Sequence, residues 1–187
     1  MARKRFASDQ WIAVEALDDA GQGVAHSDGF RLEIDNALPG EAVRVAVLKR
    51  RGRSLRCLAL AVRDAHPLRQ RALCPQAGRC GGCSQQHLPP TEQRRQKAET
   101  LAALFEAAGV RAPGRWLTPL AGPLWGYRRK ARLGVRYRAR EGDVLVGFRE
   151  RGGWVSKGAS CPVLAPPFGA LLGPLKTVLK GLTIPDQ

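Results

Sequence analysis

The amino-acid sequence predicts a mainly β protein with some α-helix. Five short β-prone runs separated by turn residues fill the first third of the chain, and apolar and charged residues alternate again after residue 127. Between these regions, a cysteine-rich loop precedes one segment whose apolar residues have helical spacing. We therefore expect a five-stranded barrel of the OB type, followed by a cysteine loop, a helix and an antiparallel β-meander.

The expected barrel consists of five runs with the length and composition of strands. Turns rich in Gly, Pro and Asp separate these runs, which cover residues 11–17, 23–26, 30–34, 42–48 and 55–62. In the fourth run, Val43, Val45 and Val47 alternate with Arg44 and Ala46, so one face of that strand can be buried. Cys57 has the same alternating spacing in the fifth run, and we expect it to be a small buried hydrophobic residue.

Two segments of this region also resemble a TRAM domain, a small RNA-binding barrel. They are Gly21-Gln22-Gly23-Val24-Ala25-His26 and Ile34-Asp35-Asn36-Ala37-Leu38-Pro39-Gly40-Glu41. The resemblance implies a TRAM domain over residues 1–66. The loop after the fourth run carries Lys49, Arg50 and Arg51, a pattern that fits either a contact with RNA phosphates or a solvated hairpin tip.

The charge balance of the chain indicates a polyanionic partner. Lys and Arg number 31 against 16 Asp and Glu, which gives a formal net charge of +15. The positive residues are concentrated in runs, which favours a nucleic-acid partner over a merely basic soluble protein. Because the sequence has neither the apolar stretch of a secretory signal nor a run of ~18 apolar residues, we expect a cytoplasmic protein without a membrane span.

A helix is expected over about residues 91–109. Thr91 can cap its first turn and Gly109 can end it. The apolar positions of this segment share one face, which needs a partner surface, and they are Ala98, Leu101, Leu104, Phe105 and Ala108. A second amphipathic helix is expected over residues 171–182.

Residues 127–139 alternate as a strand with one apolar and one cationic face. The apolar positions are Ala131, Leu133, Val135, Tyr137 and Ala139. Turn residues then separate further strands at 144–149 and 154–156, which predicts the meander. The cationic face, together with the neighbouring Arg128 and Arg129, is our main candidate for binding an RNA backbone, with a solvated strand face as the alternative. The residues of the face are Lys130, Arg132, Arg136 and Arg138.

The cysteine loop is the strongest chemical signal in the sequence. Cys74, Cys80 and Cys83 have C-x5-C-x2-C spacing, and Cys161 lies far downstream, followed by proline as Cys74 is. Four thiolates can bind an iron–sulfur cluster or a structural zinc ion. Since zinc sites usually combine two C-x2-C knuckles and this loop has one, the spacing favours a four-iron four-sulfur (4Fe-4S) cluster, with zinc and buried unligated thiols as alternatives.

Four motifs in order resemble the RNA uracil-5-methyltransferases over about residues 10–187. They are Cys-Pro-x4-Cys-Gly-Gly-Cys at 74–83, Tyr127-Arg128-Arg129-Lys130, Gly147-Phe148-Arg149 and Cys161-Pro162-Val163-Leu164. In that family four cysteines bind a structural 4Fe-4S cluster, which implies the ligands Cys74, Cys80, Cys83 and Cys161. A TRAM barrel combined with the cluster is similar to the members that make 5-methyluridine in 23S rRNA.

The resemblance also implies methyl transfer from S-adenosylmethionine by a cysteine and a base in a C-terminal domain. No such residues are identifiable here, and no glycine-rich turn of the kind that cradles this cofactor follows a strand. We therefore expect the RNA-binding and iron–sulfur portion of the enzyme, with a TRAM domain at 1–66, an iron–sulfur domain at 67–187 and no catalytic domain. Such a chain would be inactive alone, and it could self-associate through the 91–109 helix if that helix packs on the missing domain.

Two other classes of protein fit parts of the sequence. One is a stand-alone TRAM-type RNA-binding module in which a cluster or zinc is only a structural staple. The other is a TRAM-containing radical enzyme with a catalytic cluster. The second is disfavoured because such clusters usually use C-x3-C-x2-C spacing and three ligands, whereas this loop has five residues in its first interval and a fourth cysteine is available downstream.

Overall fold

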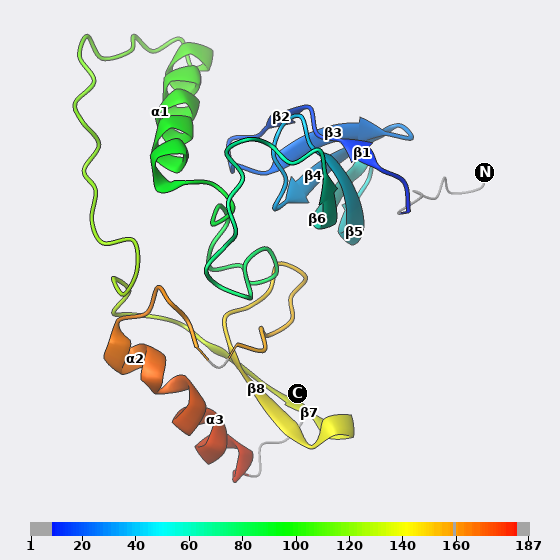
Figure 1. Ribbon diagram of the computed structural model, residues 1–187, viewed down its shortest axis with the longest axis vertical. Coiled ribbons are helices and arrows are strands. Elements are labelled where there is room, and N and C mark those ends of the chain that lie inside the picture. Colours follow the sequence, from blue (N-terminus) through cyan, green and yellow to red (C-terminus); the bar gives the residue numbers. More distant parts are fainter. Residues whose placement is uncertain (1–8, 159, 183–187) are drawn as a thin grey trace. The chain divides into compact units, whose positions relative to one another are not determined.

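The computed structural model describes residues 9–158 and 160–182, and these form two compact units. The first unit combines the chain up to Arg71 with Ser84–Ala121, and the second combines Ala72–Cys83 with the chain from Gly122 onward. Figure 1 shows the labelled strands and the helix of the first unit, and the hairpin and the helices of the second. The chain thus passes between the units more than once, whereas the sequence analysis placed a single boundary after residue 66.

The first unit contains a six-stranded mixed sheet with the order β1-β5-β6-β4-β3-β2. All neighbouring strands are antiparallel except β4 and β6, which are parallel. The strands are β1 (Ile12–Ala13), β2 (Ala16–Leu17), β3 (Gly23–Ser27), β4 (Phe30–Asp35), β5 (Ala42–Arg51) and β6 (Ser54–Arg63). Four of the five predicted runs are confirmed as single strands, and the run 11–17 is divided between β1 and β2.

The two short strands bring the edges of the sheet together. β1 pairs with β5 at one edge and β2 pairs with β3 at the other, yet only Val14 and Glu15 separate them in the chain. The amide of Val14 donates to the carbonyl of Glu41 (2.9 Å), and the amide of Glu15 donates to the carbonyl of Val24 (2.8 Å). The predicted run could not remain one strand because it bonds to two different partners, and the division curls the sheet around a single core.

The core of this unit is built from alternate residues of the long strands, as the period of a β-strand requires. Its buried residues include Leu32, Ile34, Val43, Val45 and Cys57. Val47 was expected to share this face but is 40% exposed, and it lies next to a register shift in the pairing of β5 with β6 between Val47 and Lys49. The prediction that Cys57 is buried is confirmed, and burial raises the pKa of its thiol to about 12.

An ion pair fastens the segment after β6 back onto the sheet. Glu41 is fully buried and accepts hydrogen bonds from Nε and Nη2 of Arg69, at 2.5 and 2.7 Å. The same carboxylate accepts the amides of Leu38 (2.8 Å) and His66 (3.1 Å). Burial opposes ionisation of Glu41, but these hydrogen bonds outweigh it and keep the pKa of the carboxyl below its ordinary value.

Helix α1 (Pro90–Ala107) lies at the predicted place but begins differently. Pro89 is its N-cap residue and Thr91 lies inside the first turn, so the prediction that Thr91 caps the helix is wrong. Proline at the first helical position explains this start, since its missing N–H would have had no helical partner anyway. The end is confirmed, because Gly109 follows the helix with φ +63°.

The second unit consists of a hairpin and two short helices. Strands β7 (Gly134–Arg138) and β8 (Asp143–Gly147) are joined by the 3₁₀ turn Ala139–Glu141, and helices α2 (Pro166–Ala170) and α3 (Leu172–Lys180) follow. Helix α3 packs against β8, whose residues 144–146 are buried, and Lys176 binds the Asp143 carboxylate at 3.0 Å.

The hairpin differs from the predicted three-stranded meander in two ways. The strand predicted from residue 127 begins only at Gly134, and the strand predicted at 154–156 is reduced to one bridge between Arg149 and Val155. The apolar face predicted for the first strand is not buried, since Val135 and Tyr137 are 45% and 41% exposed. Alternation identifies two faces of a strand, but a two-stranded sheet covered by one helix on its β8 side buries little of β7.

Candidate metal centre and nucleic-acid interface

The cysteine loop folds as a series of turns held against the end of the hairpin. The amide of Ala77 donates to the carbonyl of Cys74 (3.0 Å), and the amide of Cys80 donates to that of Gln76 (2.9 Å). Gly81 donates to the carbonyl of Arg149 (3.0 Å). Cys74, Cys80 and Cys83 are all half-buried in this loop.

The fold brings Cys161 within electrostatic range of the three loop cysteines. Burial raises the pKa of Cys74, and the charges of Cys161 and Cys83 raise it further. Burial also raises the pKa of Cys80, with further contributions from the charges of Cys83, Cys161 and Cys74. The four predicted ligands therefore lie within electrostatic range of one another, although 78 residues separate Cys83 from Cys161 in the sequence. Cys57 is in the core of the other unit.

The spacing of these side chains bears on which metal could bind. Within residues 9–158 and 160–182, no three His, Cys, Asp or Glu side chains converge closely enough to hold a single metal ion. A tetrahedral zinc site with Zn–S bonds of ~2.3 Å needs sulfur atoms only about 3.8 Å apart. A polynuclear cluster binds its thiolates at separate iron atoms, which requires a wider arrangement. Four thiolates are a donor set that suits either an iron–sulfur cluster or a structural zinc ion.

Two glycines, Gly81 and Gly82, lie between Cys80 and Cys83 in the loop. The amide of Gly82 donates to Sγ of Cys80 at 3.4 Å, the kind of N–H···S contact that stabilises thiolates and clusters. A Cβ on Gly81 would lie 2.8 Å from the carbonyl oxygen of Arg149, which is closer than real Cβ contacts allow. Gly81 is therefore needed for the loop to approach the hairpin.

The predicted RNA-binding residues fall into separate groups. Lys49, Arg50 and Arg51 are exposed at the end of β5, and the Arg50 guanidinium stacks on the Phe30 ring at 4.8 Å. Arg129 and Lys130 are exposed in the segment before β7. The structure does not bring these two groups into one unit.

The cationic face predicted for one strand is divided by the structure. Arg136 in β7 stacks on the exposed ring of Trp154 at 4.1 Å. The side chain of Arg138 is only 17% exposed and forms ion pairs with Glu141 and Asp143, so it stabilises the hairpin turn. Lys130 and Arg132 precede the strand.

A cavity of about 380 Å³ in the second unit contains two of the predicted arginines. Its lining also includes Phe148 and Arg149, which the sequence analysis quoted in a motif but did not assign to a site. The sequence feature that could have identified these two residues as a site is an aromatic residue directly followed by an arginine. The lining residues are Gly81, Gly82, Arg128, Arg132, Leu133, Gly134, Phe148 and Arg149.

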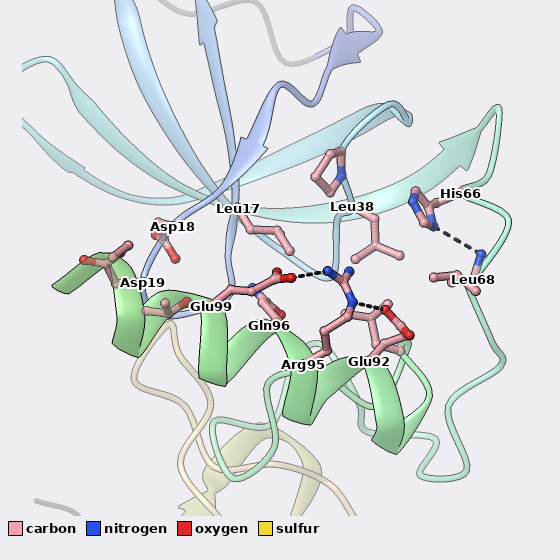
Figure 2. A pocket seen from close by; sticks show the side chains of 14 residues that line it. Leu17, Asp18, Asp19, Leu38, His66, Leu68, Glu92, Arg95, Gln96 and Glu99 are labelled. Carbon is pink, nitrogen blue, oxygen red and sulfur yellow. Dashed lines mark hydrogen bonds and ion pairs between the residues drawn. The ribbon is translucent and has the colours of Figure 1, made fainter. Parts of the chain in front are cut away.

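A cavity of about 390 Å³ in the first unit has the opposite character (Figure 2). It lies between α1 and the turns of the sheet, and acidic residues from both sides line it, including Asp18, Asp19, Glu92 and Glu99. Figure 2 shows Arg95 on α1 bound by Glu92 (2.8 Å) and Glu99 (2.5 Å). No residue of this cavity was predicted as a site.

Comparison with known proteins gives a consistent result. No protein-family model matches the chain. The 23S rRNA (uracil(1939)-C(5))-methyltransferase RlmD of Alkalilimnicola ehrlichii is 44% identical over 177 residues, and the proteins of the same name from Bordetella pertussis and Alcanivorax borkumensis are 41% and 39% identical over 179 and 186 residues. The alignments cover 94%, 94% and 97% of this chain. The chain resembles one part of a 23S rRNA (uracil-C5)-methyltransferase.

The match covers a minor share of each RlmD relative. The chain spans 40%, 38% and 42% of the lengths of these three proteins. It therefore resembles part of a transferase, as the sequence analysis predicted.

The fold also matches the tRNA (uracil-54, C5)-methyltransferase of Pyrococcus abyssi, solved in complex with S-adenosyl-L-homocysteine. The TM-score is 0.60 at 23% identity, over 93% of this chain and 37% of that chain. At this identity the match supports the fold alone. In the described residues, no helix is both long and apolar enough to cross a membrane.

Proposed function

We propose that this chain is the RNA-binding and iron–sulfur portion of an S-adenosylmethionine-dependent 23S rRNA uracil C5-methyltransferase that acts in the cytoplasm. The observation that carries the proposal is the approach of Cys161 to the three cysteines of the loop, within a chain that matches RlmD proteins along nearly its whole length. In this proposal residues 1–66 form a TRAM barrel and residues 67–187 form an iron–sulfur domain.

The proposed ligands of a 4Fe-4S cluster are Cys74, Cys80, Cys83 and Cys161. When bound, the cluster supplies a covalent link between parts of the chain that are distant in sequence. The chain's own residues hold the site ready: Gly81 fixes the loop to the hairpin, and the Gly82 amide faces a sulfur. The C-x5-C-x2-C spacing of the loop, which has a single C-x2-C pair, is the reason to prefer the cluster over zinc.

RNA binding in this proposal uses both units. In the first unit, Lys49, Arg50 and Arg51 extend from the sheet, and phosphates are their expected ligands. In the second, the arginines before β7 lie around a cavity in which an unpaired base or a phosphate can be bound. Arg138 is omitted from these contacts because it is already held by two carboxylates.

Methyl transfer itself is assigned to the longer protein. None of the described residues is proposed as the cysteine nucleophile or as the base that removes the C5 proton. We expect the isolated chain to bind RNA and to show no methyltransferase activity with S-adenosylmethionine.

The experiment that tests the metal assignment is iron, acid-labile sulfide and zinc analysis of anaerobically purified chain. The expected result is iron and sulfide in equal amounts, with a strong loss of both in Cys161→Ser. Cys57→Ser is the matched control and should keep the full metal content, because Cys57 is buried in the other unit. Zinc alone, or iron that is unaffected by Cys161→Ser, would contradict the assignment.

A further inference from the structure

The arginine-lined cavity of the second unit has an uncompensated positive charge. Arg128, Arg132 and Arg149 contribute three guanidinium groups, and the cavity lining contains no acidic residue. Among the described residues, none of the three is within ion-pair distance of a carboxylate, whereas Arg138 on the same hairpin has two such partners. A concave site with several unneutralised arginines attracts an anion, and a planar guanidinium is well suited to bind phosphate oxygens.

The same cavity offers an aromatic surface. Phe148 is half-buried in its wall, and the guanidinium of Arg128 lies 5.6 Å from the centre of the ring. Flat groups of this kind stack on nucleobases, and such stacking tolerates any base. A simple phosphate site would not need the ring, so the combination indicates a ligand with both a phosphate and an aromatic base.

Glycines allow close backbone packing around the cavity. A Cβ on Gly81 would lie 2.8 Å from the Arg149 carbonyl oxygen, and a Cβ on Gly134 would lie 2.9 Å from Cγ2 of Val155. A Cβ on Gly82 would lie 3.7 Å from Cγ of Phe148. The glycines thus bring the cysteine loop and the start of β7 close around the aromatic ring, and the volume of about 380 Å³ is in the range of small-ligand pockets (~300–1,000 Å³).

We propose that this cavity binds one unpaired nucleotide of the RNA substrate, with its base against Phe148 and its phosphate between Arg132 and Arg149. The inference rests on the proposed RNA-binding function and goes beyond it by naming a single-nucleotide subsite and two residues, Phe148 and Arg149, that the sequence did not assign. A nucleotide within a duplex is excluded from such a site, because its base faces are covered by neighbouring bases.

The test uses the full chain, purified anaerobically, and a fluorescein-labelled single-stranded RNA of mixed sequence, with binding followed by anisotropy over a range of salt concentrations. Arg149→Gln should reduce the slope of log affinity against log salt by about 0.7, the loss of one phosphate contact with a single strand. Phe148→Leu should weaken binding about tenfold with an unchanged slope, because stacking releases no counterions. Phe148→Tyr should restore the affinity.

Arg140→Gln is the charge-matched control. Arg140 lies in the exposed turn between β7 and β8 and is not part of the cavity lining. This variant should leave both the affinity and the slope unchanged. An equal effect of Arg140→Gln and Arg149→Gln would overturn the subsite in favour of diffuse charge.

A second measurement reports stacking directly. A single-stranded RNA containing 2-aminopurine should lose fluorescence on binding to the unsubstituted chain and to Phe148→Tyr, but much less on binding to Phe148→Leu at saturation. If the unsubstituted chain binds no RNA, the proposed function fails together with the subsite. If it binds RNA and the Phe148 and Arg149 variants bind equally well, the subsite alone is overturned.

Discussion

The cavity beside α1 and the cavity beside the cysteine loop have nearly the same volume but differ in how their charges are compensated. In the first, acidic residues surround Arg95, which is held by Glu92 and Glu99 on the same helix. In the second, three arginines share a wall with Phe148 and have no carboxylate in the lining. An arginine in a basic stretch of sequence can therefore be neutralised by nearby carboxylates or be free to bind an anion. The residues that surround it in the folded structure determine which of the two applies.

The difference extends to the surroundings of each cavity. The first lies near the buried pair of Glu41 and Arg69, which hold sheet and following segment together. The second is bounded by glycines, by the exposed Arg132 and Arg149 and by the half-buried Arg128. We therefore expect substitutions around the first cavity to change stability and substitutions around the second to change RNA binding.

The largest effect is expected at the buried carboxylate. Glu41→Ala would leave the Arg69 guanidinium, which is only 16% exposed, without its partner, and the loss of one member of such a pair costs about 3–5 kcal/mol of unfolding free energy. Urea denaturation would measure it. The control is Glu15→Ala, which removes an exposed partner of His26 and should change the unfolding free energy little. Similar losses in both variants would contradict the distinction between compensated buried and exposed charge.

A second effect concerns the pH dependence of stability. Burial, together with the charge of Arg69, lowers the pKa of His87 from its ordinary value of 6.5 to about 4. The unfolded chain therefore binds a proton at higher pH than the folded chain does. The stability contributed by neutral His87 is complete above pH 6.5 and is lost as the pH falls from there toward 4, by about 3 kcal/mol at most.

Denaturation midpoints between pH 7 and pH 4 would test this expectation. His87→Gln should flatten the pH dependence in that window. An unchanged pH profile in His87→Gln would show that another group is responsible.

A third effect would separate the shape of the second cavity from its charge. Gly81→Ala places a Cβ against the Arg149 carbonyl and should cost about 1–3 kcal/mol of stability while weakening RNA binding. Gly152→Ala is the matched control, because a Cβ there would meet no atom within 4 Å and Gly152 does not line the cavity. Thermal unfolding and RNA anisotropy should distinguish the two variants. Equal behaviour would mean that the loop can move away from the hairpin.

The smallest effect compares one arginine from each cavity. Arg132→Gln should reduce RNA affinity severalfold and lower the salt slope by about 0.7, since its guanidinium is available to a phosphate. Arg95→Gln should leave RNA binding unchanged, because both of its neighbours already compensate its charge. Equal losses of RNA affinity in the two variants would contradict the proposed difference in charge compensation between the two cavities.

The sequence by itself determined the features that depend on local spacing. Strands β3 to β6 lie where alternating residues predicted them, Cys57 is buried as its position in the alternation required, and Gly109 ends α1. Each of these features depends on the conformational preferences of a few neighbouring residues. These preferences follow directly from the residue types and their spacing in the sequence. The spacing of the three loop cysteines also predicted them as a set of ligands, with Cys161 downstream as a fourth candidate.

The tertiary structure alone determined which strands pair, which faces are buried and which charges form ion pairs. It divided the first predicted strand between two edges of the sheet, left Val135 and Tyr137 exposed, and neutralised Arg138 with two carboxylates. It also placed Phe148 and Arg149 beside the cysteine loop. Periodicity specifies which side chains share a face but carries no information about what covers that face. Pairing, burial and charge compensation therefore depend on contacts between residues that are distant in the chain.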